Sequence, residues 1–186
     1  MAAERVAELL YAARVLAGIN CLPATDGNFS ARLADGRALV TRRGIEKRLL
    51  AESDLIEVSL DEFQPTEASS EWKLHRALYH ARPDVYAILH VHAPNLGVFV
   101  AAGKVPDVKL LMEAEMTLGG IAMIPYAEPG SPDVGRLAVD MGNNAGVLLL
   151  ERHGVVALGG SVQEALHRIE RAEFLARVQL DMASLR

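Results

Sequence analysis

Segments typical of strands and segments typical of helices follow one another along almost the whole chain. Residues 85–92, "VYAILHVH", form an apolar run typical of a buried strand, whereas residues 3–16 place apolar side chains at helical spacing. A chain in which both kinds of segment are interspersed folds as a sheet covered by helices. We therefore predict an α/β protein.

The other elements are predicted from the same patterns. Further strands are expected at residues 29–33, 38–41, 55–61, 146–151 and 155–158. Further helices are expected from residues 69–71 to 81, at 93–103, at 131–141 and at 161–182. Ser161 and Glu164 form a capping box at the start of the last helix. Around Glu113 and Glu115 we assign no element, and of two readings, acids that line the pocket or acids at the surface, we favour the surface.

Composition bounds the domain organisation and the class of protein. The 186 residues are 51% hydrophobic and 23% charged, which is typical of a globular protein, and we predict a single domain over residues 1–186. The net charge of −5 argues against a general nucleic-acid binder. No apolar run approaches the roughly 18–20 residues of a membrane span, and the single cysteine, Cys21, cannot form an internal disulfide. We expect a cytoplasmic protein that acts on a small molecule.

Two histidines interrupt the run at residues 85–92. His90 and His92 are two residues apart, so in a strand their side chains project from the same face, at a spacing that can hold one ion. His153 lies in "RHG" between two apolar strands, where Gly154 is expected to let the backbone turn sharply. Three histidines around zinc leave one position open, as in catalytic sites. The residues alone also allow a structural reading of each histidine.

Glu71 lies at the expected start of a helix, beside Ser69 and Ser70. The free N–H groups and the positive end of the dipole make such a helix end a candidate anion site. A carboxylate is also stabilised there simply as an N-terminal acid, so a catalytic and a structural role both stay open. His75 follows one turn later on the same face, where we expect it to support Glu71 or to pack.

Two polar stretches that contain glycine are further candidates for ligand binding. Residues 25–30, "TDGNFS", include Gly27 and Asn28, and residues 41–48, "TRRGIEKR", include Arg43 and Gly44 among basic residues. Either stretch is equally consistent with a turn and a solvated basic face.

Taken together, these segments resemble the class II aldolase/adducin family, and within it the fuculose-phosphate aldolases. The resemblance covers almost the whole chain and is carried by "GNFS", "VTRRGI", "SSEWKLHRALYHARPDVYAILHVHAP" and "ERHGVVALGGSVQEAL", in that order. It implies a single-domain, three-layer α/β/α fold with a largely antiparallel central sheet. It also implies a homotetramer with active sites near the subunit interfaces.

The resemblance further implies a Zn²⁺ ion, or another divalent metal, held by three histidines and an acid. The implied metal ligands are His90, His92, His153 and Glu71. Glu71 would then act as the general acid and base. The implied reaction cleaves a phosphorylated ketose similar to fuculose 1-phosphate into dihydroxyacetone phosphate and an aldehyde, by way of a metal-stabilised enediolate.

The same resemblance implies where the substrate binds. The phosphate is expected among Asn28, Gly44, Ser69 and Ser70, and Asn28 is expected to donate to a developing oxyanion. Arg43 departs from the small hydroxyl residue of those aldolases, and its guanidinium either strengthens phosphate binding or selects a carboxylate.

A second departure concerns the C-terminus. The chain stops at Arg186, soon after the last expected helix. Those aldolases continue into a tail that contributes a catalytic tyrosine from a neighbouring subunit. We expect this proton donor to be missing or to be replaced by another group, which counts against efficient cleavage of fuculose phosphate.

Other activities on the same metal site stay open: a sugar-phosphate epimerase, a dehydratase or a 3-oxo-acid decarboxylase. The related epimerase usually has aspartate in place of Glu71, which favours the aldolase, whereas a carboxylate paired with Arg43 would favour a decarboxylase.

Two further rivals differ in kind. A non-catalytic adducin-like binding module would have lost the metal ligands, and all of them are present here. A lysine imine mechanism, with Lys73, Lys104 and Lys109 as the available amines, is the chemical rival, but none of these lysines lies in a motif that suggests a depressed pKa.

Overall fold

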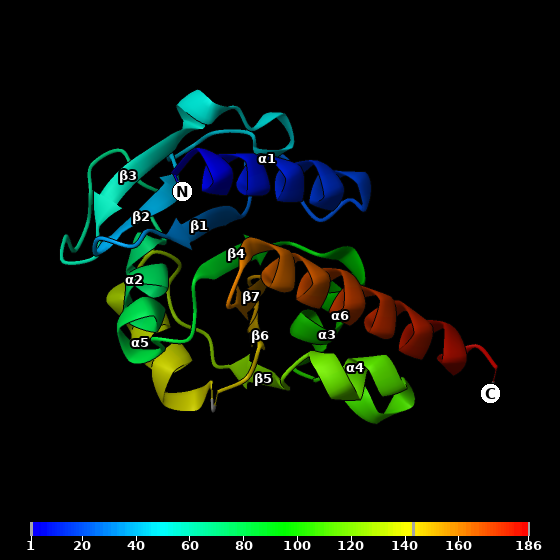
Figure 1. Cartoon of the computed structure of the whole chain (residues 1–186). Coiled ribbons are helices and arrows are strands. Elements are labelled where there is room, and N and C mark those ends of the chain that lie inside the picture. Colours follow the sequence, from blue (N-terminus) through cyan, green and yellow to red (C-terminus); the bar gives the residue numbers. More distant parts are fainter. Residues whose placement is uncertain (1, 143, 186) are drawn as a thin grey trace.

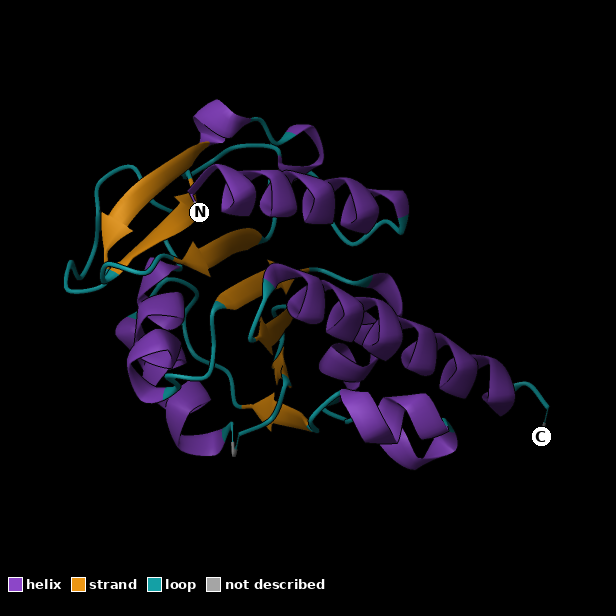
Figure 2. Cartoon of the chain, in the orientation of Figure 1, coloured by secondary structure: helices purple, strands orange, loops and turns teal. Residues whose placement is uncertain are grey.

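A computed structural model describes residues 2–142 and 144–185 of the chain. Within these residues a seven-stranded sheet lies between two layers of helices. In Figure 1, α1 and α6 cover one face of the sheet, and α2 and α5 lie side by side on the other. Figure 2 shows the same arrangement by element type. The predicted three-layer α/β/α architecture is confirmed.

The elements follow the order expected from the sequence. The strands are β1 (Asn28–Arg32), β2 (Arg37–Thr41), β3 (Leu55–Ser59), β4 (Ala87–Val91), β5 (Ile121–Ile124), β6 (Val147–Leu150) and β7 (Val155–Gly159). The α-helices are α1 (Ala2–Gly18), α2 (Trp72–Ala81), α3 (Pro94–Ala102), α4 (Met112–Thr117), α5 (Pro132–Met141) and α6 (Val162–Ala183). Short 3-10 helices lie at Lys47–Leu49, Glu52–Asp54 and Val108–Leu110.

The sheet has the strand order β3-β2-β1-β4-β7-β6-β5. Neighbouring strands are antiparallel, except for the parallel pair of β5 and β6. The prediction of a largely antiparallel sheet is therefore confirmed. The central strand β4 pairs with β1 and β7, which brings His90 opposite Asn28 on one side and Val156 on the other.

Strict alternation along the strands divides the core between the two faces of the sheet. In β4, Leu89 packs into the core formed with α1, α3 and α6, whereas Ile88 packs into the core formed with α2 and α5. Because side-chain direction repeats every two residues, His90 projects to the same face as Ile88, toward α2. His90, the metal-ligand candidate in β4, thus faces the helix that follows Glu71.

Three local features differ from the expectations. Helix α2 begins at Trp72, one residue after the range in which we placed its start, so Glu71 precedes the first turn as its N-cap. The elements α4 and β5 have no counterpart among the expected elements. Helix α4 has only six residues, and β5 has four residues at the sheet edge, so neither is long enough to show a clear period. Glu113 and Glu115 are exposed on α4, as expected.

No helix in the described part of the chain combines the length and apolar character that crossing a membrane requires.

Candidate active site

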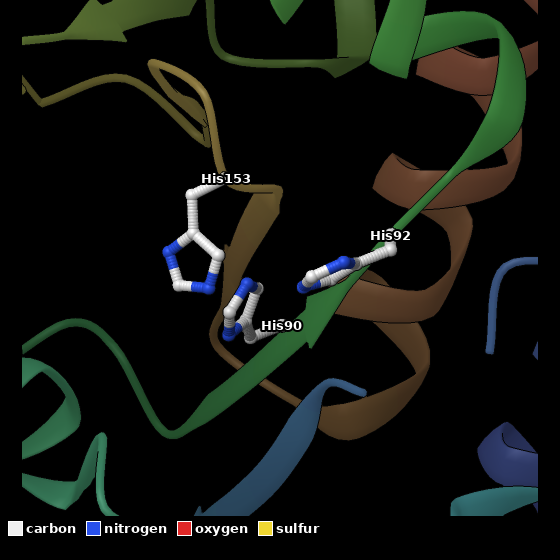
Figure 3. Close-up of side chains that lie close together, drawn as sticks. All are labelled: His90, His92 and His153. Atoms are coloured by element: carbon white, nitrogen blue, oxygen red, sulfur yellow. The ribbon is translucent and has the colours of Figure 1, made fainter. Parts of the chain in front are cut away.

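Three histidines from two parts of the chain meet at one end of the sheet. His90 lies near the end of β4, His92 follows directly after this strand, and His153 lies in the connection between β6 and β7. One nitrogen of each ring lies within 4.8 Å of one nitrogen of each of the others. Figure 3 shows the three rings turned toward one another. His90 is 1% exposed, and the other two side chains are half-buried.

Glycine at position 154 provides the space for this convergence. A Cβ atom there would lie 2.7 Å from Nε2 of His90 and 2.9 Å from Cδ2 of His92. The expectation that Gly154 supplies the sharp turn is wrong, because the left-handed residue of this connection is Arg152, with φ of 60°. The small size of Gly154, rather than its backbone freedom, is what the site requires.

The three histidines fit a divalent metal ion. Nε2 of His90 is buried and has no hydrogen-bond partner among the described residues. Burial, followed by the nearby charge of His90, lowers the pKa of His92 to about 4 and lowers that of His153 below its usual value. Both rings are therefore neutral at pH 7 and offer lone pairs. Three imidazole donors are a ligand set that zinc and similar ions accept.

Glu71 joins this cluster from the turn before α2. Its Oε2 lies 2.5 Å from Nδ1 of His90 and accepts a hydrogen bond of 3.0 Å from Nδ2 of Asn28. Its Oε1 lies 3.6 Å from Nε2 of His153 and, although buried, has no hydrogen-bond partner among the described residues. One carboxylate oxygen is thus held in place, while the other remains available.

The surroundings of Glu71 keep it ionised. Burial raises the pKa of this carboxyl, but the charge of His90, its hydrogen bond and the further contributions of His153 and Asn28 outweigh burial and hold the pKa well below its usual range. A carboxylate with a free oxygen beside a metal site has the protonation state that a general base requires.

Two carboxylates orient the imidazole rings. A ring nitrogen that faces a carboxylate carries the proton, so the contact of His90 Nδ1 with Glu71 leaves Nε2 for a metal. Asp26 lies beside His92 at a longer distance, with its Oδ2 3.4 Å from Nδ1. Asp26 is not among the residues singled out from the sequence. Its place directly before Gly27 and Asn28, in a stretch already singled out, was the available signal.

The histidines, Glu71 and the polar stretches line one cavity of about 260 Å³. Its lining includes every residue that we predicted for the site: Asn28, Arg43, Gly44, Ser69, Ser70, Glu71, His90, His92 and His153. It also includes Thr25, Asp26, Gly27, Arg42, Lys47 and Pro129. The structure thus brings the predicted residues together, and their individual roles stay predictions. The rival lysines Lys73, Lys104 and Lys109 are not part of this lining.

The basic residues of the cavity differ in how they are engaged. Arg42 forms an ion pair with Glu67. Lys47, which is 4% exposed, donates to the carbonyl oxygens of Thr25 and Ile45. Arg43 is exposed at the cavity and has no ion-pair or hydrogen-bond partner for its side chain within residues 2–142 and 144–185. Its guanidinium is therefore the positive group of this cavity that is available to an anionic ligand.

The chain is similar to two lyases. It is 32% identical over 197 residues to the methylthioribulose-1-phosphate dehydratase of Methylococcus capsulatus, covering 96% of this chain and 94% of that protein. It is 31% identical over 170 residues to the 5-methylthioribulose-1-phosphate/5-deoxyribulose-1-phosphate aldolase of Rhodospirillum rubrum, covering 90% of this chain and 76% of that protein. Neither protein is named for fuculose 1-phosphate, so these relatives do not support that substrate.

A solved structure shows the same fold. The L-fuculose-1-phosphate aldolase of Thermus thermophilus superposes with a TM-score of 0.88 at 24% identity, covering 98% of this chain and 96% of that one. The sequence model of the family described as Class II Aldolase and Adducin N-terminal domain matches residues 7–180. With its fold, its histidine cluster and this match in agreement, the chain belongs to the class II aldolase/adducin family.

Proposed function

We propose that the chain is a metal-dependent lyase that dehydrates a 5-substituted ribulose 1-phosphate such as 5-methylthioribulose 1-phosphate. The observation that carries this proposal is one cavity that holds three imidazoles able to bind a metal, together with a carboxylate oxygen and a guanidinium that have no partner among the described residues. The names of the two similar lyases supply the substrate class.

The phosphate of the substrate is assigned to the end of the cavity formed by Arg43, Gly44, Ser69 and Ser70. The guanidinium of Arg43 can donate two parallel hydrogen bonds to phosphate oxygens. Of the two readings of Arg43 that the sequence leaves open, phosphate binding is favoured, because the similar lyases are named for phosphorylated ketoses.

The proposed reaction uses Glu71 as the base. The ketone at C2 acidifies the proton on C3, and Glu71 removes this proton with its free oxygen. His90, His92 and His153 would hold a divalent ion, which would supply Lewis-acid polarisation of the substrate oxygens. The C4–O bond then breaks as Glu71 gives the proton from C3 to the C4 hydroxyl, which leaves as water. The enol left at C3 rearranges to a 2,3-diketone, which completes the loss of one water.

Aldol cleavage is the second candidate, and it is favoured by the similarity to the Rhodospirillum rubrum aldolase. Here Glu71 would remove the proton of the C4 hydroxyl, the C3–C4 bond would break, and Glu71 would return this proton to C3, so that dihydroxyacetone phosphate and an aldehyde would leave. Both reactions develop negative charge at C3 beside the C2 ketone, so the same cavity serves either one.

The test is a product analysis of 5-methylthioribulose 1-phosphate incubated with the purified protein and zinc, cobalt or manganese. We expect a 2,3-diketone, trapped with o-phenylenediamine as a quinoxaline. Dihydroxyacetone phosphate, measured by coupled NADH oxidation, would instead support the aldolase. Formation of neither product, with any of the three metals, would contradict the proposal.

Three finer expectations belong to the same proposal. Zinc is the expected ion because three histidines leave one tetrahedral position open to substrate. A homotetramer with active sites near subunit interfaces is expected from the family resemblance, and light scattering after size exclusion tests it. A cytoplasmic location is expected because the single cysteine, Cys21, is free and buried.

A further inference from the structure

A row of polar contacts joins β1 to α2 beneath the candidate active site. Asn28, Ser30 and Arg32 alternate along β1 and project from the same face of the sheet. Glu71, His75 and Tyr79 are spaced four residues apart, at the N-cap and along one face of α2. Each residue of the first set makes at least one hydrogen bond to a residue of the second.

The middle of this row is fully buried. The hydroxyl of Ser30 lies 2.7 Å from Nδ1 of His75 and 2.7 Å from the hydroxyl of Tyr79. All three side chains are at most 1% exposed. Arg32 closes the row with a hydrogen bond of 2.6 Å to the carbonyl oxygen of Tyr79, and its guanidinium lies 4.8 Å from the centre of that ring.

These buried polar groups add less to the stability of the fold than apolar side chains would. Nε2 of His75 is buried and has no hydrogen-bond partner among the described residues, and burial lowers the pKa of His75 to about 3. Apolar side chains of similar shape would fill the same space and leave no polar atom unpaired. The hydrogen bonds contribute orientation, because they fix the rotation of α2 about its own axis and its position along β1.

The position of Glu71 depends on how α2 is rotated and placed on β1. The row contains two neighbouring bonds, Asn28–Glu71, which is 3.0 Å long, and Ser30–His75, which lies one helical turn further along α2. A rotation of α2 would carry Glu71 away from His90 and His153, and displacements of about 1 Å in a reacting group can cost 10²-fold in rate.

We propose that Ser30, His75 and Tyr79 are positioning residues that hold Glu71 at the reacting carbon through the setting of α2 on β1. This inference rests on the proposed role of Glu71 as the base, and it adds residues that themselves do not touch the substrate.

The experiment compares three variants of the whole protein. His75→Leu removes the bond to Ser30, whereas His75→Asn keeps a hydrogen-bonding group close to the position of Nδ1. The matched control is His80→Leu, on the same helix, because His80 is exposed and bonds instead to the carbonyl oxygen of Leu60. For each protein we would measure kcat and KM, zinc content, and hydrogen exchange of the amides at the start of α2.

We expect His75→Leu to lower kcat by about tenfold or more, with KM and zinc content close to those of the wild type. His75→Asn should recover most of kcat, and His80→Leu should leave it unchanged. Exchange at residues 72–75 should be faster in His75→Leu than in the other two variants. Wild-type kcat and exchange in His75→Leu, or equal losses in His75→Leu and His80→Leu, would overturn the proposal.

Two further outcomes are distinguishable. If His75→Leu does not fold, Ser30→Ala replaces it, since it removes both bonds of the hydroxyl with the loss of a single atom, and wild-type kcat and exchange in that variant would overturn the proposal. A wild-type protein without activity on either lyase assay would count against the proposed function, while the exchange measurement would still decide whether these residues set the start of α2.

Discussion

Among the residues of the cavity, Glu71 and the histidines have different surroundings. Glu71 is held by Asn28 and His90 through one oxygen, and its other oxygen has no hydrogen-bond partner among the described residues. His92 offers a neutral ring and lies beside Asp26. In the proposed function, Glu71 transfers protons and His92 binds the metal, and substitutions can test these two roles one residue at a time.

Substitutions at His92 and Glu71 should affect different properties. We expect His92→Ala to weaken zinc binding by about 100-fold or more, since loss of a ligand costs more than loss of its supporting partner. Glu71→Gln should keep zinc but lower kcat by about 10²–10⁴-fold, because the amide cannot accept the substrate proton. Competition with a chromophoric chelator measures the first effect, and the product assay measures the second. Full activity in Glu71→Gln would refute its role as the base.

Substitution of Gly154 should disturb the site through volume alone. Gly154→Ala places a Cβ 2.7 Å from His90 Nε2 and 2.8 Å from the carbonyl oxygen of Val91, and we expect a loss of about 1–3 kcal/mol of stability together with weaker zinc binding. In the control Gly97→Ala, the new Cβ meets nothing within 4 Å, and the free energy of unfolding should rise by about 0.5–1 kcal/mol. Urea denaturation distinguishes the two. Equal stabilities would contradict this account.

Among the elements, α6 shows most directly how local sequence sets a boundary. The hydroxyl of Ser161 accepts a hydrogen bond of 3.1 Å from the N–H of Glu164, and the carboxylate of Glu164 accepts one of 2.7 Å from the N–H of Gly160. Ser161 thus caps the helix as expected from the sequence, whereas Glu164 bonds to the N–H of Gly160 rather than to that of Ser161, which the expected capping box would require. The start of α2 contrasts with it, because the carboxylate of Glu71 makes no capping bond and faces the histidines instead.

Loss of the α6 cap should change stability and leave the chemistry alone. We expect Ser161→Ala to lower the free energy of unfolding by about 1 kcal/mol, because the N–H of Glu164 loses its partner. Thermal and urea denaturation measure this change, with kcat recorded alongside. A fall in kcat at unchanged zinc content would mean that α6 affects the site in a way that the cap does not explain.

At the level of the whole molecule, the burial of His75 makes the free energy of unfolding depend on pH. Its folded pKa of about 3 lies below the unfolded value of about 6.5. Between these values the unfolded chain binds a proton that the folded chain does not, so stability is full above pH 6.5 and falls as the pH is lowered toward 3.

The variant His75→Asn should weaken that dependence. For the metal-free protein between about pH 6 and 4, we expect the slope of the unfolding free energy against pH to fall by up to about 1.4 kcal/mol per pH unit. Denaturant titrations at several pH values measure the slope. An unchanged slope would show that other groups, such as His92, account for the acid dependence.

Much of the fold follows from patterns within short segments. The apolar run at residues 85–92, the helical spacing of α1 and the residues that start or stop α2, α5 and α6 depend on neighbours in the chain, and these elements lie where we predicted them, within a few residues. The short elements α4 and β5 escaped prediction because four to six residues do not show a clear period. Family resemblance, carried by four separated motifs, supplied the order of layers that local patterns do not contain.

The sequence by itself determined that His90, near the end of a strand, and His92, two residues later, project toward the same side, because side-chain direction in extended chain repeats every two residues. Only the tertiary structure decided that the His153 ring meets those of His90 and His92, that Asp26 lies beside His92, and that Glu71 faces His90 rather than capping its helix. These contacts join residues that are far apart in the chain, and their distances are set by the pairing of β4 with β1 and β7 and by the packing of α2 on the sheet.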